Sequence, residues 1–236
     1  MIYGSVLAGS IFSILALWLP ILVGPAVLFF SIAAYLSYVR FRFSPSGGDI
    51  QNLVRGLVLS NLVWDGRGTA LDIGCGNGAL AIMLAKRYPD ANVVAIDFWG
   101  KRWEYSREVC ENNARVEDVD SRVKFQKASA ASLPFDEEHF DVVVSNFVFH
   151  EVSGVEDKRD LIREALRVVR RGGSFSFQDE FLMSKIYGDP EDLIDTIRSW
   201  GVEEAELVRT CDADFIPASL KVPMFLGTIA IIAGRK

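Results

Sequence analysis

The sequence predicts an α/β fold, a doubly wound sheet preceded by a hydrophobic helical hairpin. From residue 68 onward, short apolar strands alternate with amphipathic helices. This alternation is typical of a parallel sheet with helices on both faces and ligands at the carboxyl ends of the strands. Before residue 40 the 236-residue chain has no charged side chain. We therefore expect a hydrophobic membrane anchor over residues 1–43, a linker over 44–49 and one domain over 50–236.

The uncharged N-terminal stretch is long enough for one membrane-spanning helix, which needs about 20 apolar residues, or for two shorter helices. Pro20 and the pair Gly24-Pro25 lie in its middle. Proline disrupts a helix interior and glycine–proline pairs mark turns, so we expect a hairpin of Ile2–Leu19 and Ala26–Val39. The second arm is short for a full span unless it continues through Phe43.

The side-chain charges nearest to this stretch are Arg40 and Arg42. Positive flanks remain on the cytoplasmic side, so we expect a membrane protein with its domain on the cytoplasmic face. A secretory signal peptide is the weaker interpretation, because no basic residue precedes the apolar run. A hydrophobic arm that packs on a partner subunit is a third interpretation.

The domain reads as alternating helices and strands, beginning with a helix directly after the linker. Strands are expected at Ala70–Ile73, Val93–Asp97, Val123–Lys127, Val142–Ser145, Phe175–Asp179, Ala205–Arg209 and Gly227–Ala233. Helices are expected at Ile50–Val63, Leu80–Tyr88, Arg102–Asn113 and Lys158–Val169, with a helical stretch near Asp195–Trp200.

A strand, a glycine turn and a helix follow one another between Thr69 and Leu80. Three closely spaced glycines, Gly74, Gly76 and Gly78, let the backbone approach a ligand at the helix N-terminus. The spacing comes close to the G-x-G-x-x-G/A pattern of dinucleotide-binding proteins, so a nicotinamide or flavin cofactor is admissible. About 20 residues further on, Asp97 ends the second strand, where a carboxylate can accept hydrogen bonds from both hydroxyls of a ribose.

Four ordered segments resemble the motifs of class I S-adenosylmethionine-dependent methyltransferases. The first is an acidic residue, Asp72, followed by the alternating glycines. Residues 128–135 (ASAASLPF) and 140–146 (FDVVVSN) resemble two later motifs, and residues 161–173 (LIREALRVVRRGG) resemble the helix and glycine turn before the fifth strand. The resemblance implies a Rossmann-like seven-stranded sheet that ends in an antiparallel hairpin, with S-adenosyl-L-methionine as the cofactor.

The resemblance also implies which residues bind that cofactor. They are Asp72, Gly74, Cys75, Gly76, Gly78, Asp97, Phe98, Ser129, Ala130 and Asn146. Phe98 and Trp99 are placed to flank an adenine ring. Ser129 is a departure, because the family often has an acidic residue at this position. Its hydroxyl, or the backbone around Ala130, can still read the adenine edge.

Methyl transfer depends mainly on positioning, and a general base is needed only when the acceptor must lose a proton. The candidates follow the fourth and fifth strands: His150, Glu151, Asp179 and Glu180. His150 is the strongest catalytic candidate, being one of two histidines in the chain. The alternative is that His150 makes a local hydrogen bond and shapes the pocket.

Composition limits the partners. The net charge of −6 argues against a nucleic-acid surface, and the three scattered cysteines indicate neither a metal site nor a disulfide framework. The chain from Phe215 to Leu226 is unusually apolar for a loop. It lies on a membrane surface, covers an acceptor pocket or packs on the sheet edge.

We therefore expect a membrane-anchored S-adenosylmethionine-dependent methyltransferase that acts on a small-molecule or lipid-like acceptor. Two other classes remain open: an NAD-dependent oxidoreductase, and a methyltransferase-like binding subunit without catalysis.

Overall fold

The structure is a computed structural model that describes residues 1–100 and 105–236. The chain divides into two compact units, Met1–Leu53 and Val54–Lys236, which we describe separately. The predicted helix Arg102–Asn113 begins outside the described residues; its described part is α5, Arg107–Val116.

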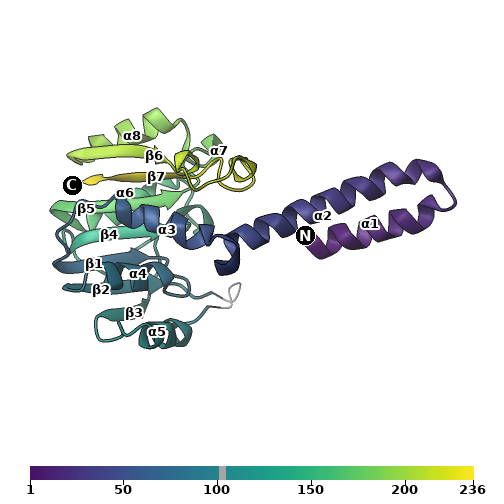
Figure 1. Cartoon of the computed structure of the whole chain (residues 1–236). Coiled ribbons are helices and arrows are strands. Elements are labelled where there is room, and N and C mark those ends of the chain that lie inside the picture. The colour runs from purple at the N-terminus through teal and green to yellow at the C-terminus, as the bar shows by residue number, and fades with distance from the viewer. Residues whose placement is uncertain (101–104) are drawn as a thin grey trace. The chain divides into compact units, whose positions relative to one another are not determined.

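The first unit is a helical hairpin, although its bounds differ from the expected ones (Figure 1). Helix α1 covers Ile2–Ala16, a 3-10 turn covers Pro20–Leu22, and helix α2 covers Val23–Phe43. The Pro20 turn ends the first arm early. Pro25 stands in the first turn of α2, where its missing N–H is not needed, so the helix begins before it.

The two arms of the hairpin differ in length. The 21 residues of α2 give a length of about 31 Å, close to the thickness of a hydrocarbon core, because the helix does continue through Phe43. The 15 residues of α1 give only about 22 Å. By length and composition, one helical stretch among the described residues, Pro20–Phe43, is long and apolar enough to cross a membrane.

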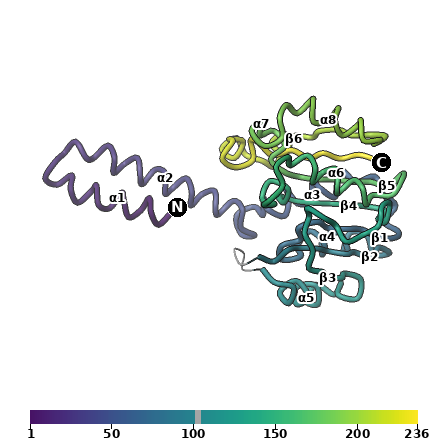
Figure 2. Tube along the Cα trace, turned by 180° about the vertical axis from the view of Figure 1, so that it is seen from behind, coloured from purple at the N-terminus to yellow at the C-terminus, as the bar shows by residue number. Residues whose placement is uncertain are grey.

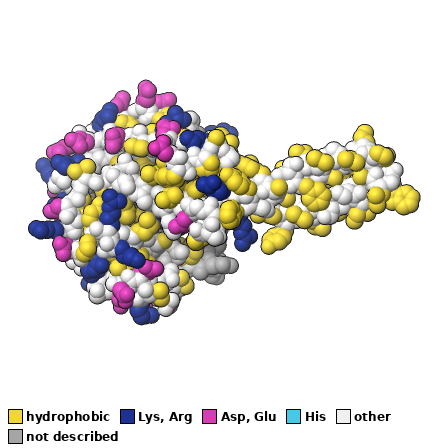
Figure 3. Space-filling model, in the orientation of Figure 1, with side chains coloured by type: hydrophobic (Ala, Val, Ile, Leu, Met, Phe, Trp, Pro, Cys, Tyr) yellow, Lys and Arg dark blue, Asp and Glu magenta, His cyan; other side chains and the backbone are white. Residues whose placement is uncertain are grey.

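The two arms pack through small residues and aromatic rings. A Cβ at Gly9 would lie 3.2 Å from the ring of Phe30, and the rings of Phe12 and Phe29 stack with centroids 5.5 Å apart. On the outside, large apolar side chains such as Trp18 are exposed. Before Arg40 the hairpin has no charged side chain, and its visible surface is largely hydrophobic (Figure 3).

The second unit is built on one seven-stranded sheet with the order β3-β2-β1-β4-β5-β7-β6. Its strands are β1 Gly68–Ile73, β2 Ala91–Asp97, β3 Val123–Lys127, β4 Phe140–Asn146, β5 Val169–Asp179, β6 Glu204–Arg209 and β7 Ala230–Arg235. Strands β1 to β5 run parallel and β7 runs antiparallel between β5 and β6. The predicted seven-stranded doubly wound sheet with a closing antiparallel hairpin is thus confirmed.

Helices cover both faces of this sheet (Figures 1 and 2). They are α3 Ile50–Ser60, α4 Ala79–Arg87, α5, α6 Arg159–Arg167, α7 Ser184–Tyr187 and α8 Pro190–Ser199. One apolar core lies between the sheet and α3, α4 and α5, and the other lies between the sheet and α6, α7 and α8. The short helix α7 is not among the predicted elements.

Strand β5 departs from the prediction at its start. The strand begins at Val169, before the two glycines that were expected to precede it. Phe140 pairs with Val169 but Val142 pairs with Ser174, so residues 170–173 form a bulge. Gly172, with φ +71°, supplies the left-handed backbone that such a bulge favours. The predicted last strand also shifts, from Gly227–Ala233 to Ala230–Arg235.

The carboxyl ends of the parallel strands lie on one edge of the sheet, which is where ligands bind in this architecture. The turn from β1 to α4 is at this edge. Gly74 has φ +73°, and a Cβ there would lie 2.2 Å from Cγ2 of Val148, which follows β4. Gly76, with φ +56°, has no such neighbour: its nearest side-chain atom would be 3.7 Å away, on Tyr105. Gly74 is therefore needed for packing, whereas a Cβ at Gly76 would only make an ordinary contact with Tyr105.

This difference predicts unequal effects of two similar substitutions. Gly74→Ala adds a clash with Val148 to the left-handed strain and should lower the free energy of unfolding by about 2–4 kcal/mol. Gly76→Ala adds the strain alone, about 1–2 kcal/mol. Denaturant titration measures both, and a Val148→Ala background should reduce the cost of Gly74→Ala. Equal losses in the two single variants would show that the Val148 contact does not matter.

Candidate functional site

A carboxylate from the second strand holds the glycine turn. The Oδ2 atom of Asp97 accepts a hydrogen bond from the backbone N–H of Gly76 at 2.9 Å, and its Oδ1 atom accepts one from the N–H of Trp99 at 2.8 Å. The N–H groups of Gly74 and Cys75 both donate to the carbonyl of Ile96. The turn between β1 and α4 is thus fixed to the end of β2. A carboxylate has about four acceptor positions, so Asp97 can still accept from a ribose.

Side chains from further along the chain hold the carbonyls of the same turn. The carbonyl of Gly76 accepts from Nε1 of Trp99 at 3.0 Å and from Sγ of Cys110 at 3.1 Å. The amide of Asn113 donates to the carbonyl of Asn77 at 3.0 Å. No sequence spacing singles out Cys110 and Asn113, and Trp99 was expected at the adenine rather than in this bracing role.

Asp72 is a buried carboxyl group directly before the turn. It is 1% exposed, and its Oδ2 atom has no hydrogen-bond partner among the described residues. Burial raises the pKa of Asp72 to about 7, and the negative charge of Asp97 adds to this, while the N–H of Ala81 and the charge of Arg55 act in the opposite direction. Without an external partner, the negative charge of this carboxylate is only partly balanced, which is typical of a ligand-binding group.

The turn is poorly suited to a pyrophosphate. Its N–H groups at Gly74, Cys75, Gly76 and Gly78 all donate to acceptors within the protein. The carboxyl of Asp72 lies close to Ala81, near the N-terminus of α4. A dinucleotide would place its phosphates at this helix N-terminus. A phosphate there would meet the negative charges of Asp72 and Asp97. This geometry disfavours the NAD-dependent interpretation.

The same geometry suits a cofactor with hydroxyl and amine donors and no phosphate. The side chain of Asn146, at the end of β4, adds a second buried oxygen, Oδ1, that lacks a partner among the described residues. The ribose and amino-acid portions of S-adenosylmethionine supply hydroxyl and cationic amine donors, so the residues present fit this cofactor. Asp97 and Asp72 would hold those two portions.

The remaining predicted cofactor residues lie at the same edge in different environments. Phe98 is 63% exposed with Nζ of Lys127 5.2 Å from its ring centroid, which leaves a free aromatic face. The hydroxyl of Ser129 accepts from the N–H of Ala131 at 3.2 Å but keeps its own hydrogen to donate. Ala130 is half-buried beside it. The Cys75 side chain is buried in the core, so only its backbone faces the turn.

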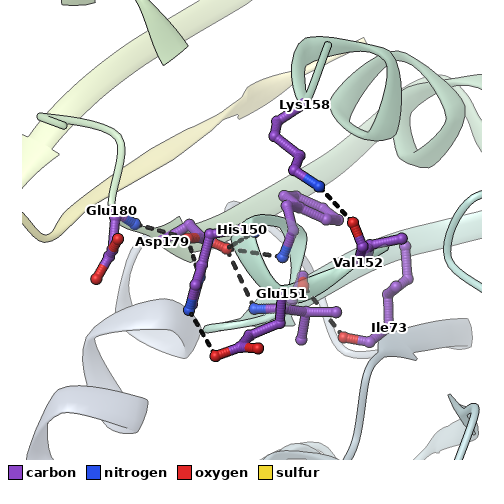
Figure 4. Close-up of polar contacts among 10 residues, drawn as sticks. Ile73, His150, Glu151, Val152, Lys158, Asp179 and Glu180 are labelled. Carbon is purple, nitrogen blue, oxygen red and sulfur yellow. Dashed lines mark hydrogen bonds and ion pairs between the residues drawn. The ribbon is translucent and has the colours of Figure 1, made fainter. Parts of the chain in front are cut away.

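A histidine–aspartate pair lies at the carboxyl ends of two strands: His150 follows β4 and Asp179 is the last residue of β5 (Figure 4). Nδ1 of His150 lies 2.6 Å from Oδ1 of Asp179, and the side chain of Asp179 is fully buried. The Oδ2 atom of Asp179 accepts from the N–H groups of Val148 and Phe149, and Oδ1 accepts from the N–H of Glu180. These bonds fix the carboxylate, and the carboxylate in turn fixes the imidazole, so that Nε2 is left for another partner.

The charges around His150 are negative. Burial by itself lowers the pKa of His150. The hydrogen bond to Asp179 and the charges of Asp179, Glu180 and Glu151 outweigh this effect and raise that pKa above its usual value of 6.5. Oε1 of Glu151 lies 3.5 Å from Nε2 and its side chain is 54% exposed, so it can move aside. A raised pKa makes the neutral imidazole a stronger base.

Tyr187 of α7 is a further polar group close to this pair. Its hydroxyl is buried without a hydrogen-bond partner among the described residues. Burial, followed by the negative charge of Asp179, raises the pKa of this phenol, so it remains neutral. It was not predicted from the sequence, because a tyrosine in a short unpredicted helix gives no signal.

Comparison with known proteins agrees with the geometry. Residues 71–177 match the family described as a methyltransferase domain. The 27-O-demethylrifamycin SV methyltransferase of Amycolatopsis mediterranei is 37% identical over 48% of this chain and 39% of that protein. The ubiquinone/menaquinone biosynthesis C-methyltransferase UbiE of Pseudomonas fluorescens is 35% identical over 50% and 45%. The chain thus spans about two fifths of the length of these curated relatives.

Acceptors differ among the relatives. The ribosomal RNA small subunit methyltransferase C of Klebsiella pneumoniae is 32% identical over 56% of this chain and 36% of that protein. The expectation that this chain does not act on nucleic acid therefore stays a prediction.

Solved structures share the fold at low sequence identity. Geranyl diphosphate C-methyltransferase from Streptomyces coelicolor, in complex with S-adenosyl-L-homocysteine, has a TM-score of 0.60 and 15% identity over 80% of each chain. The [4+2]-cyclase SpnF has a TM-score of 0.57 and 21% identity over 78% of this chain and 80% of that chain. Residues 71–177 thus match a methyltransferase domain, the sheet has the fold of solved methyltransferases, and the site geometry fits S-adenosylmethionine as the cofactor.

Proposed function

We propose that this protein is a methyltransferase that acts at the cytoplasmic face of a membrane on a small-molecule or lipid-like acceptor. The observation that carries the proposal is the glycine turn bound to Asp97 beside the Oδ2 atom of Asp72, which lacks a hydrogen-bond partner among the described residues. Such a turn is built for a cofactor with a ribose and a cationic amine but without phosphate. Small-molecule methyltransferases among the relatives support the acceptor class.

The residues around His150 supply the remaining chemistry. Bound S-adenosylmethionine provides a methyl carbon that is activated by its sulfonium. Asp72 and Asp97 hold the cofactor, and Nε2 of His150 takes the proton that a hydroxyl acceptor must lose. Asp179 keeps the imidazole oriented through the 2.6 Å hydrogen bond to Nδ1. The same carboxylate stabilises the imidazolium that forms after the proton transfer, because a hydrogen bond between two charged groups is stronger than one to a neutral donor.

The same charges restrict the acceptor. Glu151, Glu180 and Asp179 make the surroundings of His150 electronegative. An anionic acceptor would be repelled there, and its repulsion would be weakly screened at this partly buried site. We therefore favour a neutral or cationic acceptor over a phosphate-bearing one. For the same reason we disfavour nucleic acid as the acceptor.

The helical hairpin supports the proposed membrane attachment. Before Arg40 its helices carry no charged side chain, and the hydroxyls of Ser10, Ser13 and Ser37 donate to backbone carbonyls four residues earlier. These internal bonds satisfy the three hydroxyl donors without water, as a lipid environment requires. Arg40 and Arg42 in the last turn of α2 favour a cytoplasmic domain.

The first prediction concerns Asp72 and the cofactor. Because the pKa of Asp72 is about 7 and a cationic amine favours the ionised form, binding should release one proton. The affinity for S-adenosylmethionine should rise about tenfold per pH unit below pH 7 and level off above it. Calorimetry in buffers of different ionisation enthalpy measures this proton release. A pH-independent affinity in the unaltered protein would contradict the role.

Asp72→Asn is the control, because it should weaken cofactor binding without unfolding the protein. Its affinity should be low and independent of pH. A carboxyl whose pKa in the folded chain is raised above its usual value of 3.8 opposes folding as the pH rises between 3.8 and 7. Asp72→Asn should therefore be more stable than the unaltered protein at pH 8, while binding the cofactor more weakly.

A second prediction tests the base. His150→Gln should lower turnover by about 100- to 10,000-fold and leave the affinity for S-adenosylmethionine unchanged. Turnover is measured as transfer of a labelled methyl group into membrane extracts. Unimpaired turnover would reduce His150 to a residue that shapes the pocket, and no turnover in the unaltered protein would favour a binding subunit without catalysis.

The pH profile gives a sharper test of the same residue. Only neutral His150 accepts a proton, so turnover should rise with pH through its raised pKa. Glu151→Gln removes one of the negative charges that raise this pKa and should move the rise to lower pH. Asp157→Asn, a change at an exposed carboxylate that is not among these charges, is the matched control and should leave the profile in place.

A third prediction concerns the anchor. Deletion of residues 1–42 should release a soluble domain that binds S-adenosylmethionine, because the site residues all lie in the second unit. The full chain should float with lipid vesicles. An insoluble or unfolded truncated chain would show that the apolar arm belongs to the domain core.

A further inference from the structure

The connection between β6 and β7 ends in an exposed apolar turn, Lys221–Met224, which we call the β6–β7 tip. Met224 is 72% exposed and Val222 is 38% exposed, with Pro223 between them. Large apolar side chains next to one another on a surface, with a lysine beside them, are typical of a contact with a partner or a membrane.

The tip is a rigid turn. The N–H groups of Phe225 and Gly227 both donate to the carbonyl of Val222, and a Cβ at Gly227 would lie 2.6 Å from the carbonyl carbon of Val222. On either side, Leu220 and Leu226 are buried and joined by a backbone hydrogen bond. The buried leucines root the turn in the domain, so its apolar side chains are held outward.

The tip lies on the edge of the sheet that carries His150 and Asp179. Asp179, Ala230 and Arg209 pair in one row across β5, β7 and β6. The connection of residues 210–229 leaves from that row. It is also tied to the segment after β5, because the N–H of Leu182 donates to the carbonyl of Thr228 at 3.1 Å, and α7 lies beside it in both views (Figures 1 and 2). Lys185 of α7 adds a second exposed basic side chain.

The short linker between α2 and α3 favours a membrane as the partner of the β6–β7 tip. Six residues, 44–49, separate the last residue of α2 from the first of α3, and even a fully extended chain of that length spans only about 20–22 Å. A membrane in which α2 ends is therefore always within reach of the domain. A bilayer offers an apolar layer beneath anionic headgroups, which matches apolar side chains flanked by lysines.

We infer that the β6–β7 tip inserts into the headgroup region of the membrane that holds the hairpin. This inference rests on the proposed anchoring. Val222, Pro223 and Met224 enter the apolar boundary, and Lys221 and Lys185 contact anionic phospholipid. The carboxyl edge of the sheet then faces the bilayer, and a lipid-like acceptor reaches His150 without crossing water.

An environment-sensitive fluorophore on a cysteine tests the contact in the full chain. The native cysteines are buried, so Met224→Cys is labelled selectively. Val116→Cys is the matched control: Val116 is apolar and also 72% exposed, but it ends α5 at the opposite edge of the sheet. The labelled proteins are reconstituted in vesicles of phosphatidylcholine and phosphatidylglycerol, and flotation is measured together with quenching by brominated lipids.

We expect both proteins to float, with blue-shifted and quenched emission at position 224 and unchanged emission at position 116. Lys221→Glu should reduce the quenching at 224. Floating vesicles with equal emission at the two positions would overturn the tip contact and leave the anchor intact. Failure to float would overturn both proposals.

Discussion

The cofactor site depends on one carboxylate that bridges two backbone segments. Asp97 accepts the N–H of Gly76 on one side and that of Trp99 on the other, and Trp99 returns a hydrogen bond to the carbonyl of Gly76. Hydrogen bonds to a charged group contribute about 1.5–3 kcal/mol each, enough to help hold a turn whose three glycines have no side chains to pack. The ribose partner and the brace are therefore the same residue, so cofactor binding acts on a geometry that is already formed.

The carboxyl of Asp72, unlike that of Asp97, destabilises the folded chain when it is ionised. Its burial raises its pKa to about 7, which means that the folded chain holds an ionised carboxyl there at a cost in stability. Asp179 is also fully buried, but it accepts hydrogen bonds on both oxygens. One buried carboxylate is satisfied by the protein and orients a histidine; the other lacks a partner for Oδ2 among the described residues and suits a cationic ligand.

The sequence predicts much of the fold because the strands are short apolar runs that alternate with amphipathic helices. The strand after Asp120 matches to the residue, and the glycine turn lies where its three glycines require. Predictions fail where long-range pairing decides: the β5 bulge depends on β4, and α7 depends on packing against the sheet. At the site, Asp97 and His150 stand out locally, whereas Cys110 and Asn113 reach the turn only after folding.

The sheet topology places the β6–β7 connection at the edge that carries Asp179. Because β7 runs antiparallel between β5 and β6, the β6–β7 connection leaves the sheet from the row that carries Asp179. This connection contains an apolar turn rooted by two buried leucines, and six residues separate the apolar helix α2 from α3. In the membrane-anchored state that we propose, two apolar segments on one chain would raise each other's local concentration at the bilayer, so that a turn too small to bind lipid alone would still orient the site.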